Sequence, residues 1–193
     1  AILPPDNIVG SVVYPACEIV KPGTIRHIAG NRFSLGEPEG SESDRLKFIS
    51  DILKKAGFRA PIQKNIRDEI WLKLIGNLSF NPISALTGAT LEQICNDQGT
   101  EAIVRAMMTE AKIIAEELGA KINMSIEKRI DGARKVGAHK TSMLQDIEAG
   151  KPIEIDSIII AVKELGELTC SPTPYIDTIL NLTLQKAKLI GCL

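Results

Sequence analysis

The chain has 193 residues, 44% of them hydrophobic, and a formal net charge of −1 at pH 7. This length is enough to bury one sizeable core, or one core plus a fragment of another domain. The balanced charge, with no long basic run, argues against nucleic acid as a partner. Charged residues interrupt each apolar segment well before the roughly 20 residues that a membrane-spanning helix needs, so no membrane partner is expected either.

Cysteine and histidine usage argues against a metal site. The four cysteines show no C-x-x-C spacing, and the chain has only two histidines. A zinc site or a disulfide framework is therefore not expected, and a reducing, cytoplasmic location fits best. No signal peptide is visible, and the first residue, Ala1, is not a translation start.

The N-terminal part of the sequence favours β-strands. Residues 8–14 and 24–29 are rich in strand-forming side chains and are separated by a Lys-Pro-Gly turn signature. A third strand is predicted at 32–36, after a Gly-Asn pair that suits a two-residue hairpin. Three such strands cannot bury their own faces, so we expect them to form the edge of a larger sheet. His27, in the second strand, is expected to have a structural role.

A polar segment at 37–42 is the predicted domain boundary, which divides the chain into residues 1–42 and 43–193. Beyond it the hydrophobic period becomes helical. Ser43 or Asp44 is predicted to cap a first helix that ends at Gly57, and a short extended piece is predicted at 58–62. Later helices are predicted at 99–118, 126–136, 153–165 and from 174 to about 188.

Three details of these later helices can be predicted. The basic residues of the helix at 126–136 are most simply a solvated face: Lys128, Arg129, Arg134 and Lys135. Ser142 begins a capping-box pattern. The pair Thr173-Pro174 is typical of a helix cap followed by a proline at the first helical position.

The most informative stretch is residues 70–82, which is apolar almost all the way round and is typical of a buried helix. Lys73, Asn77 and Asn81 interrupt it at intervals of four residues, so they share one helix face. Buried polar groups are costly unless they are satisfied, so either partner side chains cover this face or it lines a cleft. Gly76 weakens the helix and indicates that something approaches its backbone closely. Pro82 is expected to kink or end the helix.

A second polar stretch lies at 139–156, where Glu154 stands between Ile153 and Ile155 ahead of an apolar run. A carboxylate in that position is either a first-turn residue that favours the helix dipole or a partner for a cation. Lys73 is the cation already placed on an apolar helix. Ser142, taken alone, fits a helix cap better than a ligand-binding hydroxyl.

The two stretches together resemble the C-terminal half of the ketopantoate reductases (2-dehydropantoate 2-reductases). The resemblance rests on "WLKLIGNLSFNPISAL" followed, about 60 residues later, by "HKTSMLQDIEAGKPIEID". The earlier "IRHIAGNRFSLGEP" is similar to the closing strands of that family's nucleotide-binding domain, and "PTPYIDTIL" is similar to its last helix. The resemblance covers essentially the whole chain.

The resemblance implies a mainly α fold: an all-helical domain of the 6-phosphogluconate-dehydrogenase-like type, preceded by a short β remnant of a truncated α/β Rossmann domain. Residues 1–42 would be the terminal strands of the nucleotide-binding domain, and 43–193 the helical domain for substrate binding and dimerisation. The implied enzyme is an NADPH-dependent oxidoreductase that reduces the C2 carbonyl of ketopantoate to pantoate, in coenzyme A synthesis. A small 2-ketoacid substrate follows from the same resemblance. A homo-oligomer is expected for another reason: the strands within residues 7–36 should leave apolar surface uncovered, and the chain should associate through them or through its helical face.

The resemblance also implies roles for five residues by motif position. Lys73 corresponds to the catalytic lysine, which would give a proton or a charged hydrogen bond to the oxygen that becomes an alkoxide. Glu154 matches the acidic residue that interacts with the substrate hydroxyl and with the lysine. Asn77 and Ser142 match substrate-binding positions, and Asn81 either contacts substrate or supports the helix.

Two departures from the family pattern leave alternatives open. No G-x-G-x-x-G phosphate loop occurs in the chain, so it is expected to be a fragment that is inactive and binds NADPH poorly by itself. The segment 87–90 lacks an asparagine that the family often carries near there, which leaves the identity of the ketoacid open. The alternatives are a reductase of the same architecture for another 2-ketoacid, and a helical dimerisation module without catalysis.

Overall fold

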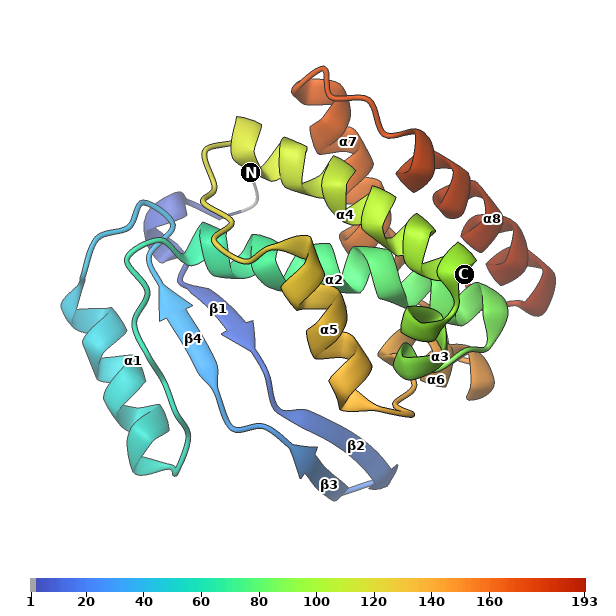
Figure 1. Ribbon diagram of the computed structural model, residues 1–193. Coiled ribbons are helices and arrows are strands. Elements are labelled where there is room, and N and C mark those ends of the chain that lie inside the picture. Colours follow the sequence, from blue (N-terminus) through green and yellow to red (C-terminus); the bar gives the residue numbers. More distant parts are fainter. Residues whose placement is uncertain (1–2) are drawn as a thin grey trace. The chain divides into compact units, whose positions relative to one another are not determined.

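The computed structural model describes residues 3–193, without the side chains of Pro5 and Glu18, and is mainly helical with short antiparallel strands near the N-terminus (Figure 1). It forms two compact units, one up to Ile70 and one from Trp71 onward. The elements of the first unit are η1 (Pro5–Asn7), β1 (Gly10–Val13), β2 (Ala16–Lys21), β3 (Thr24–Ala29), β4 (Phe33–Gly36), α1 (Asp44–Lys55) and the start of α2 (Ile66–Thr87). The second unit holds the rest of α2, then α3 (Leu91–Asn96), α4 (Gln98–Glu117), α5 (Ile126–Val136), α6 (Ser142–Glu148), η2 (Asp156–Ile160), α7 (Ala161–Leu168) and α8 (Pro174–Ile190).

The strands pair differently from the predicted order. In the described residues β2 pairs with β3, and β1 pairs with β4, as two separate two-stranded antiparallel sheets. The predicted hairpin between 24–29 and 32–36 is therefore wrong: Gly30, at φ +75°, leads the chain from one sheet to the other instead. The sequence pattern misses β2 because Pro15 precedes it and because Glu18 and Lys21 belong to residue types that are depleted in strands. His27 donates to the Gly30 carbonyl at this turn.

The first unit extends well beyond the predicted boundary at 37–42. Leu35 of β4, Leu46 of α1 and Ala60 form one buried cluster. The extended piece predicted at 58–62 is confirmed, since residues 59 and 62 form parallel bridges with Arg32 and Leu35. These contacts join α1 and the segment after it to the strands, so the compact unit ends at Ile70 and not at residue 42.

Ser43 is the N-cap of α1, as predicted: its hydroxyl accepts a hydrogen bond of 3.2 Å from the Leu46 amide. The same hydroxyl donates to Glu37, which also accepts from Arg45. These hydrogen bonds favour the charged carboxylate, and they lower the pKa of Glu37 to about 2. A short, partly buried network thus fixes the start of α1.

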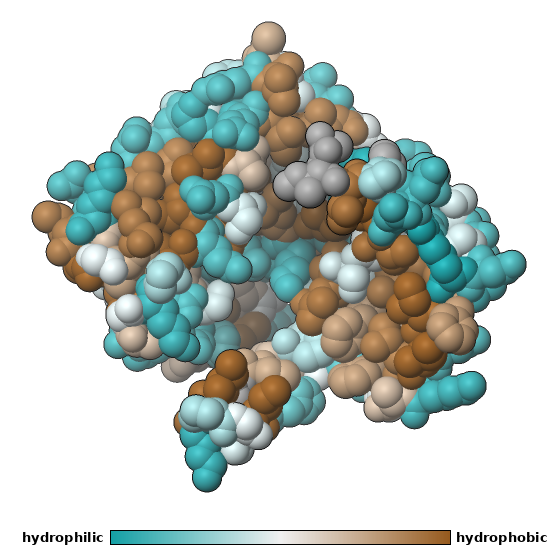
Figure 2. Space-filling view, turned by 180° about the vertical axis from the view of Figure 1, so that it is seen from behind, coloured by the Kyte–Doolittle hydropathy of each residue, from teal (hydrophilic) through white to brown (hydrophobic). Residues whose placement is uncertain are grey.

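Some large apolar side chains of the β2–β3 hairpin are exposed. Ile19 is 75% exposed and Ile25 is 70% exposed. Figure 2 shows brown, apolar patches at its lower left, on the projecting hairpin. The prediction that the strands leave apolar surface uncovered is therefore confirmed for the described residues.

The second unit is built around α2, whose apolar residues Leu78, Phe80 and Ile83 are buried in the main core. In Figure 1, α4, α7 and α8 lie beside one another, and α5 crosses α2. Within the described residues, no helix is long and apolar enough to cross a membrane.

Of the two outcomes expected at Pro82, a kink or the end of the helix, the second is wrong, because α2 continues to Thr87. A proline inside a helix costs roughly 3 kcal/mol. That cost is offset here by the burial of Ile83 and Ala85 immediately after the proline. Lys186 of α8 supports the end of the helix, because its ammonium donates to the carbonyls of Ala85 and Leu86.

The N-terminus of α8 is capped from another helix. Thr173 occupies the N-cap position and Pro174 is the first helical residue, as predicted, but the Thr173 side chain makes no capping hydrogen bond. Glu110 of α4 takes its place: its two carboxylate oxygens accept from the amides of Tyr175 and Ile176, each at 2.9 Å. Burial raises the pKa of Glu110, and the two amides act in the opposite direction. This carboxylate therefore ties α8 to α4.

We expect the Glu110→Ala variant to lower the free energy of unfolding by about 2–4 kcal/mol, since it leaves two amides unpaired at the start of α8. Urea denaturation followed by circular dichroism measures this loss. Glu117→Ala, at an exposed position at the end of the same helix, is the matched control and is expected to change stability by less than about 0.5 kcal/mol. Equal, small effects of the two variants would show that Glu110 does not support α8.

Candidate active site

The polar face predicted on α2 lines a cavity of about 540 Å³ in the second unit. Lys73, Asn77 and Asn81 all lie on the cavity wall. Asn81 is buried, with 5% of its surface exposed, and Lys73 and Asn77 are half-buried. The face is thus an open, polar wall of a cavity and not a stripe covered by the core.

Other parts of the cavity wall come from segments distant in sequence. Ser142, at the start of α6, and Glu154, ahead of η2, line the same cavity. All five residues that the sequence proposes for the site therefore meet in one place, although two stretches about 60 residues apart supply them. The other lining residues are Gly76, Phe80, Leu91, Arg129, Gly132, Ala133, Val136, His139 and Thr141.

Ser142 is not the cap of α6, which corrects the preferred prediction for this residue. Thr141 is the N-cap, and its hydroxyl accepts from the Leu144 amide at 3.3 Å. Ser142 is the first residue of the helix and is exposed. Since capping employs the neighbouring hydroxyl, the hydroxyl of Ser142 can serve a ligand in the cavity.

Glu154 precedes its helix instead of opening it, so the predicted helix start at Ile153 is wrong. The Ile153 amide donates to the Cys192 carbonyl at 3.0 Å, which ties this segment to the C-terminal end of the second unit. Ile153 and Ile155 are buried while Glu154 is exposed at the cavity. The chain then enters η2, a π-helical turn in which the Ala161 amide donates to the Asp156 carbonyl. The two isoleucines thus anchor the backbone and leave the carboxylate directed at the cavity.

Two opposing effects act on the Lys73 ammonium. Burial lowers its pKa below the ordinary 10.5, and the negative charge of Glu154 raises it, with the net result that the pKa is lowered. A lysine with a lowered pKa gives up its proton more readily than an exposed one. The Lys73–Glu154 arrangement can therefore hold a proton close to a ligand and release it.

Arg129 of α5 also belongs to the site, and its assignment to a solvated face is wrong. The residue is half-buried and lies on the cavity wall. It shares that wall with Gly132, Ala133 and Val136, which follow it at intervals of three, four and seven residues. This stripe of small residues on a basic helix was the sequence signal for a cavity-facing side.

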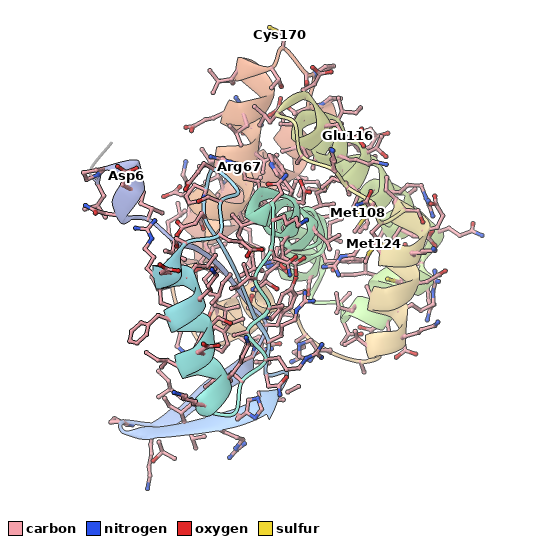
Figure 3. The ribbon with its side chains drawn as sticks, turned by 90° about the vertical axis from the view of Figure 1, so that its left-hand side faces the viewer. Asp6, Arg67, Met108, Glu116, Met124 and Cys170 are labelled. Atoms are coloured by element: carbon pink, nitrogen blue, oxygen red, sulfur yellow. The ribbon has the colours of Figure 1, made fainter. Side chains whose placement is uncertain are left out.

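Gly76 has the close neighbour that the sequence predicts. A Cβ atom at this position would lie 2.0 Å from Nη2 of Arg129. Arg129 also lines a second, small and apolar cavity, which includes Met108 and Met124, and these two lie near each other in Figure 3. Arg129 therefore lies between the core and the polar cavity.

The segment 87–90 uses its hydroxyls locally. Thr87 donates to the Ile83 carbonyl at 2.7 Å, and Thr90 forms a capping box with Gln93 at the start of α3. The next residue, Leu91, lines the cavity with an apolar side chain. The segment 87–91 therefore offers no side-chain amide to a ligand.

The described residues contain no cluster of potential metal ligands. No group of three or more potential metal ligands occurs among them. The sequence contains no G-x-G-x-x-G pattern. The chemistry that the cavity itself can perform is proton transfer and the binding of a small polar ligand.

Comparison with known proteins identifies the family of the chain. Residues 65–187 match the family model described as "Ketopantoate reductase PanE/ApbA C terminal". A 2-dehydropantoate 2-reductase from Mesorhizobium japonicum is 54% identical over 188 residues, which are 97% of this chain and 58% of the relative. This chain thus spans somewhat more than half the length of that relative.

Solved structures show the same fold. A protein from Ralstonia solanacearum MolK2, assigned to the ketopantoate reductases, superposes with a TM-score of 0.94 at 42% identity, over 99% of this chain and 58% of that one. A D-mandelate dehydrogenase solved with NADH shares the fold alone, with a TM-score of 0.88 at 20% identity over 97% of this chain and 64% of that one. The chain therefore belongs to the ketopantoate reductase family and comprises its C-terminal region.

Proposed function

We propose that this chain is the substrate-binding and proton-donating part of an NADPH-dependent 2-dehydropantoate 2-reductase. The observation that carries the proposal is that Lys73, Asn77, Asn81, Ser142 and Glu154 line a single cavity. In the reaction of the complete enzyme, NADPH would supply a hydride to the C2 carbonyl carbon of ketopantoate, which leaves negative charge on the carbonyl oxygen. The chain itself would bind no NADPH tightly and would be inactive alone.

Lys73 would stabilise that oxygen and then protonate it. Its lowered pKa favours proton release, and its positive charge favours the alkoxide as it develops. Glu154 would keep the amine protonated until the oxygen needs the proton, since a nearby carboxylate favours the ammonium form. Lys73 and Glu154 are the proposed catalytic pair.

The remaining polar groups would position the ketoacid. Asn77 lies one turn after Lys73 on the same face and would hydrogen-bond to the substrate, and Ser142 would donate to a substrate oxygen from across the cavity. Asn81, which is more buried, would contact the substrate or hold the helix face in place. Glu154 would also accept a hydrogen bond from the 4-hydroxyl of ketopantoate.

A reductase for another 2-ketoacid is the second candidate. It is favoured by the side chain of Leu91 and the locally engaged hydroxyls of 87–90, which offer less polar contact than expected at this wall. The shared fold of a D-mandelate dehydrogenase shows that this architecture accommodates other substrates. A helical dimerisation module without catalysis is the third reading, in which Lys73 and Glu154 are only a structural ion pair.

A substrate panel with the full-length reductase tests the proposal. We expect kcat/KM for ketopantoate to exceed that for the analogue without the 4-hydroxyl by about 100-fold, because the analogue leaves a polar group of the site unpaired. The reaction is followed by NADPH oxidation, with NADH in parallel. Preference for an aromatic 2-ketoacid would support the second candidate, and no turnover of any 2-ketoacid would support the third.

We further propose that the protein is a cytoplasmic homo-oligomer. The motivation is exposed apolar surface in each unit, including Ile19 and Ile25 in the first and Leu168 and Leu189 in the second. Sedimentation of a stable monomer at high concentration would contradict this assembly.

A further inference from the structure

Gly76 is a glycine within a buried helix, where this residue type costs about 1 kcal/mol relative to alanine. The structure gives a reason for it. A Cβ atom here would lie 2.0 Å from Nη2 and 2.7 Å from both Cζ and Nε of Arg129. The guanidinium therefore lies directly on the backbone of α2, in space that any other side chain at position 76 would occupy.

This contact places the guanidinium on the polar face of α2. Lys73 lies almost one turn before Gly76, and Asn77 directly follows Gly76. These three residues line the cavity together with Arg129. The Arg129 side chain also lines the small apolar cavity formed with Leu72, Ile75 and Met108. An arginine can pack its aliphatic stem against apolar side chains while its charged end faces a polar site.

The charge of the cavity suits an anion. Apart from His139, the ionisable side chains on its wall are Lys73, Arg129 and Glu154, which sum to a formal charge of +1. A 2-ketoacid carries one carboxylate. Guanidinium is planar and presents paired N–H donors that match the two oxygens of a carboxylate, whereas an ammonium is a point charge.

We propose that Arg129 binds the carboxylate of the 2-ketoacid and that Gly76 is required because it leaves room for the guanidinium. The inference rests on the proposed function, since it places a ketoacid in this cavity. It makes Arg129 a specificity-determining residue that selects acids over their neutral analogues. Gly76 acts through Arg129 and is a positioning residue.

The test uses the full-length reductase with four variants: Arg129→Met, Arg129→Lys, Gly76→Ala and the double variant Gly76→Ala/Arg129→Met. Methionine keeps much of the stem packing and removes the charge, and lysine keeps the charge without the planar fork. We expect Arg129→Met to raise KM for the ketoacid about 10–100-fold with a smaller change in kcat, which is the loss of one charged hydrogen-bonded pair. Arg129→Lys is expected to restore only part of that loss.

Gly76→Ala is the sharper variant, because alanine favours the helix and yet displaces the guanidinium. We expect it to raise KM by a factor similar to that of Arg129→Met, with no loss of melting temperature. The double variant is expected to be no worse than Arg129→Met alone, since the alanine then has no guanidinium to displace. Lys128→Met, which removes an exposed charge from the same helix, is expected to leave KM unchanged.

A neutral substrate distinguishes carboxylate binding from a purely structural role of Arg129. A structural role would not change the preference of the enzyme for the acid over its neutral analogue. The ratio of kcat/KM for the ketoacid to that for its carboxamide is expected to fall at least 10-fold in Arg129→Met. An unchanged ratio and KM, in an enzyme that still reduces the ketoacid through Lys73, would overturn this inference and leave the proposed function intact. An enzyme that reduces no 2-ketoacid would overturn both.

Discussion

Replacement of Lys73 by methionine in the full-length reductase is expected to lower kcat by about 1,000-fold or more. Methionine keeps the aliphatic bulk of the side chain and removes both the transferable proton and the positive charge. General-acid catalysis contributes about 100- to 10,000-fold, and one preorganised donor to a developing oxyanion contributes about 100- to 1,000-fold. Steady-state NADPH oxidation with saturating ketoacid measures the loss.

The same variant is expected to be at least as stable as the parent. Burial lowers the pKa of Lys73 in the folded protein, so the unfolded chain binds this proton more tightly. Between the folded pKa and the ordinary 10.5, stability therefore rises with pH, and at neutral pH the buried ammonium lowers stability. Methionine removes that penalty. Lys112→Met, a half-buried lysine of α4 that pairs with Glu116, is the matched control and should retain turnover.

Loss of turnover in Lys73→Met together with an unchanged or higher melting temperature would assign Lys73 to catalysis. Full activity in this variant would instead favour the helical-module reading, in which the lysine only balances Glu154. A lower melting temperature would show that the ammonium supports the fold. The three outcomes are separable because activity and thermal unfolding are measured on the same preparation.

Glu154→Gln is expected to lower kcat/KM about 10- to 100-fold and to move the alkaline limb of the pH profile to lower pH. The first effect reflects the loss of a charged acceptor for the substrate. The second follows from the sign of the interaction: the carboxylate raises the pKa of Lys73, so its removal lets burial lower that pKa further. A reaction step that requires the protonated amine of Lys73 is then lost at a lower pH than in the parent enzyme.

A pH–rate profile of kcat from about pH 6 to about pH 10 measures this shift. Glu148→Gln is the matched control, because Glu148 lies on α6 and pairs with Lys140 but does not line the cavity. Its alkaline limb should coincide with that of the parent. An alkaline limb that stays in place in Glu154→Gln, or moves to higher pH, would contradict the coupling of Glu154 to Lys73.

The sequence predicts those parts of the fold that depend on local pattern. The helix at 126–136 and the Ser43 cap are confirmed because periodicity and capping chemistry are local properties. Pairing of β2 with β3, the continuation of α2 through Pro82 and the capping of α8 by Glu110 were not predictable. Each depends on a partner or a buried environment that a linear pattern does not contain.

The site divides in the same way. The four-residue interval of Lys73, Asn77 and Asn81 places these residues on one helix face. The family resemblance assigns Ser142 and Glu154 to the same site. Arg129 was not predicted as part of the site, since a basic residue on a basic helix is normally solvated, and the stripe at Gly132, Ala133 and Val136 was the overlooked signal. Gly76 indicated that a neighbour approaches the backbone, but only the structure identifies that neighbour as Arg129.

The π-helical turn at Asp156–Ile160 has a consequence for comparing relatives. A π turn holds one more residue than an α turn, so the loss of a single residue here would return the helix to α geometry. The residues on either side of the turn would keep nearly the same orientation, because the extra residue is accommodated within the turn itself. A relative with a regular α-helix here is therefore aligned correctly only when a one-residue gap is placed within 156–160. Without that gap, Glu154 would be shifted by one position relative to the residues that follow the turn, so the functional equivalence of this glutamate across relatives depends on the length of the turn as well as on the residue at the aligned position.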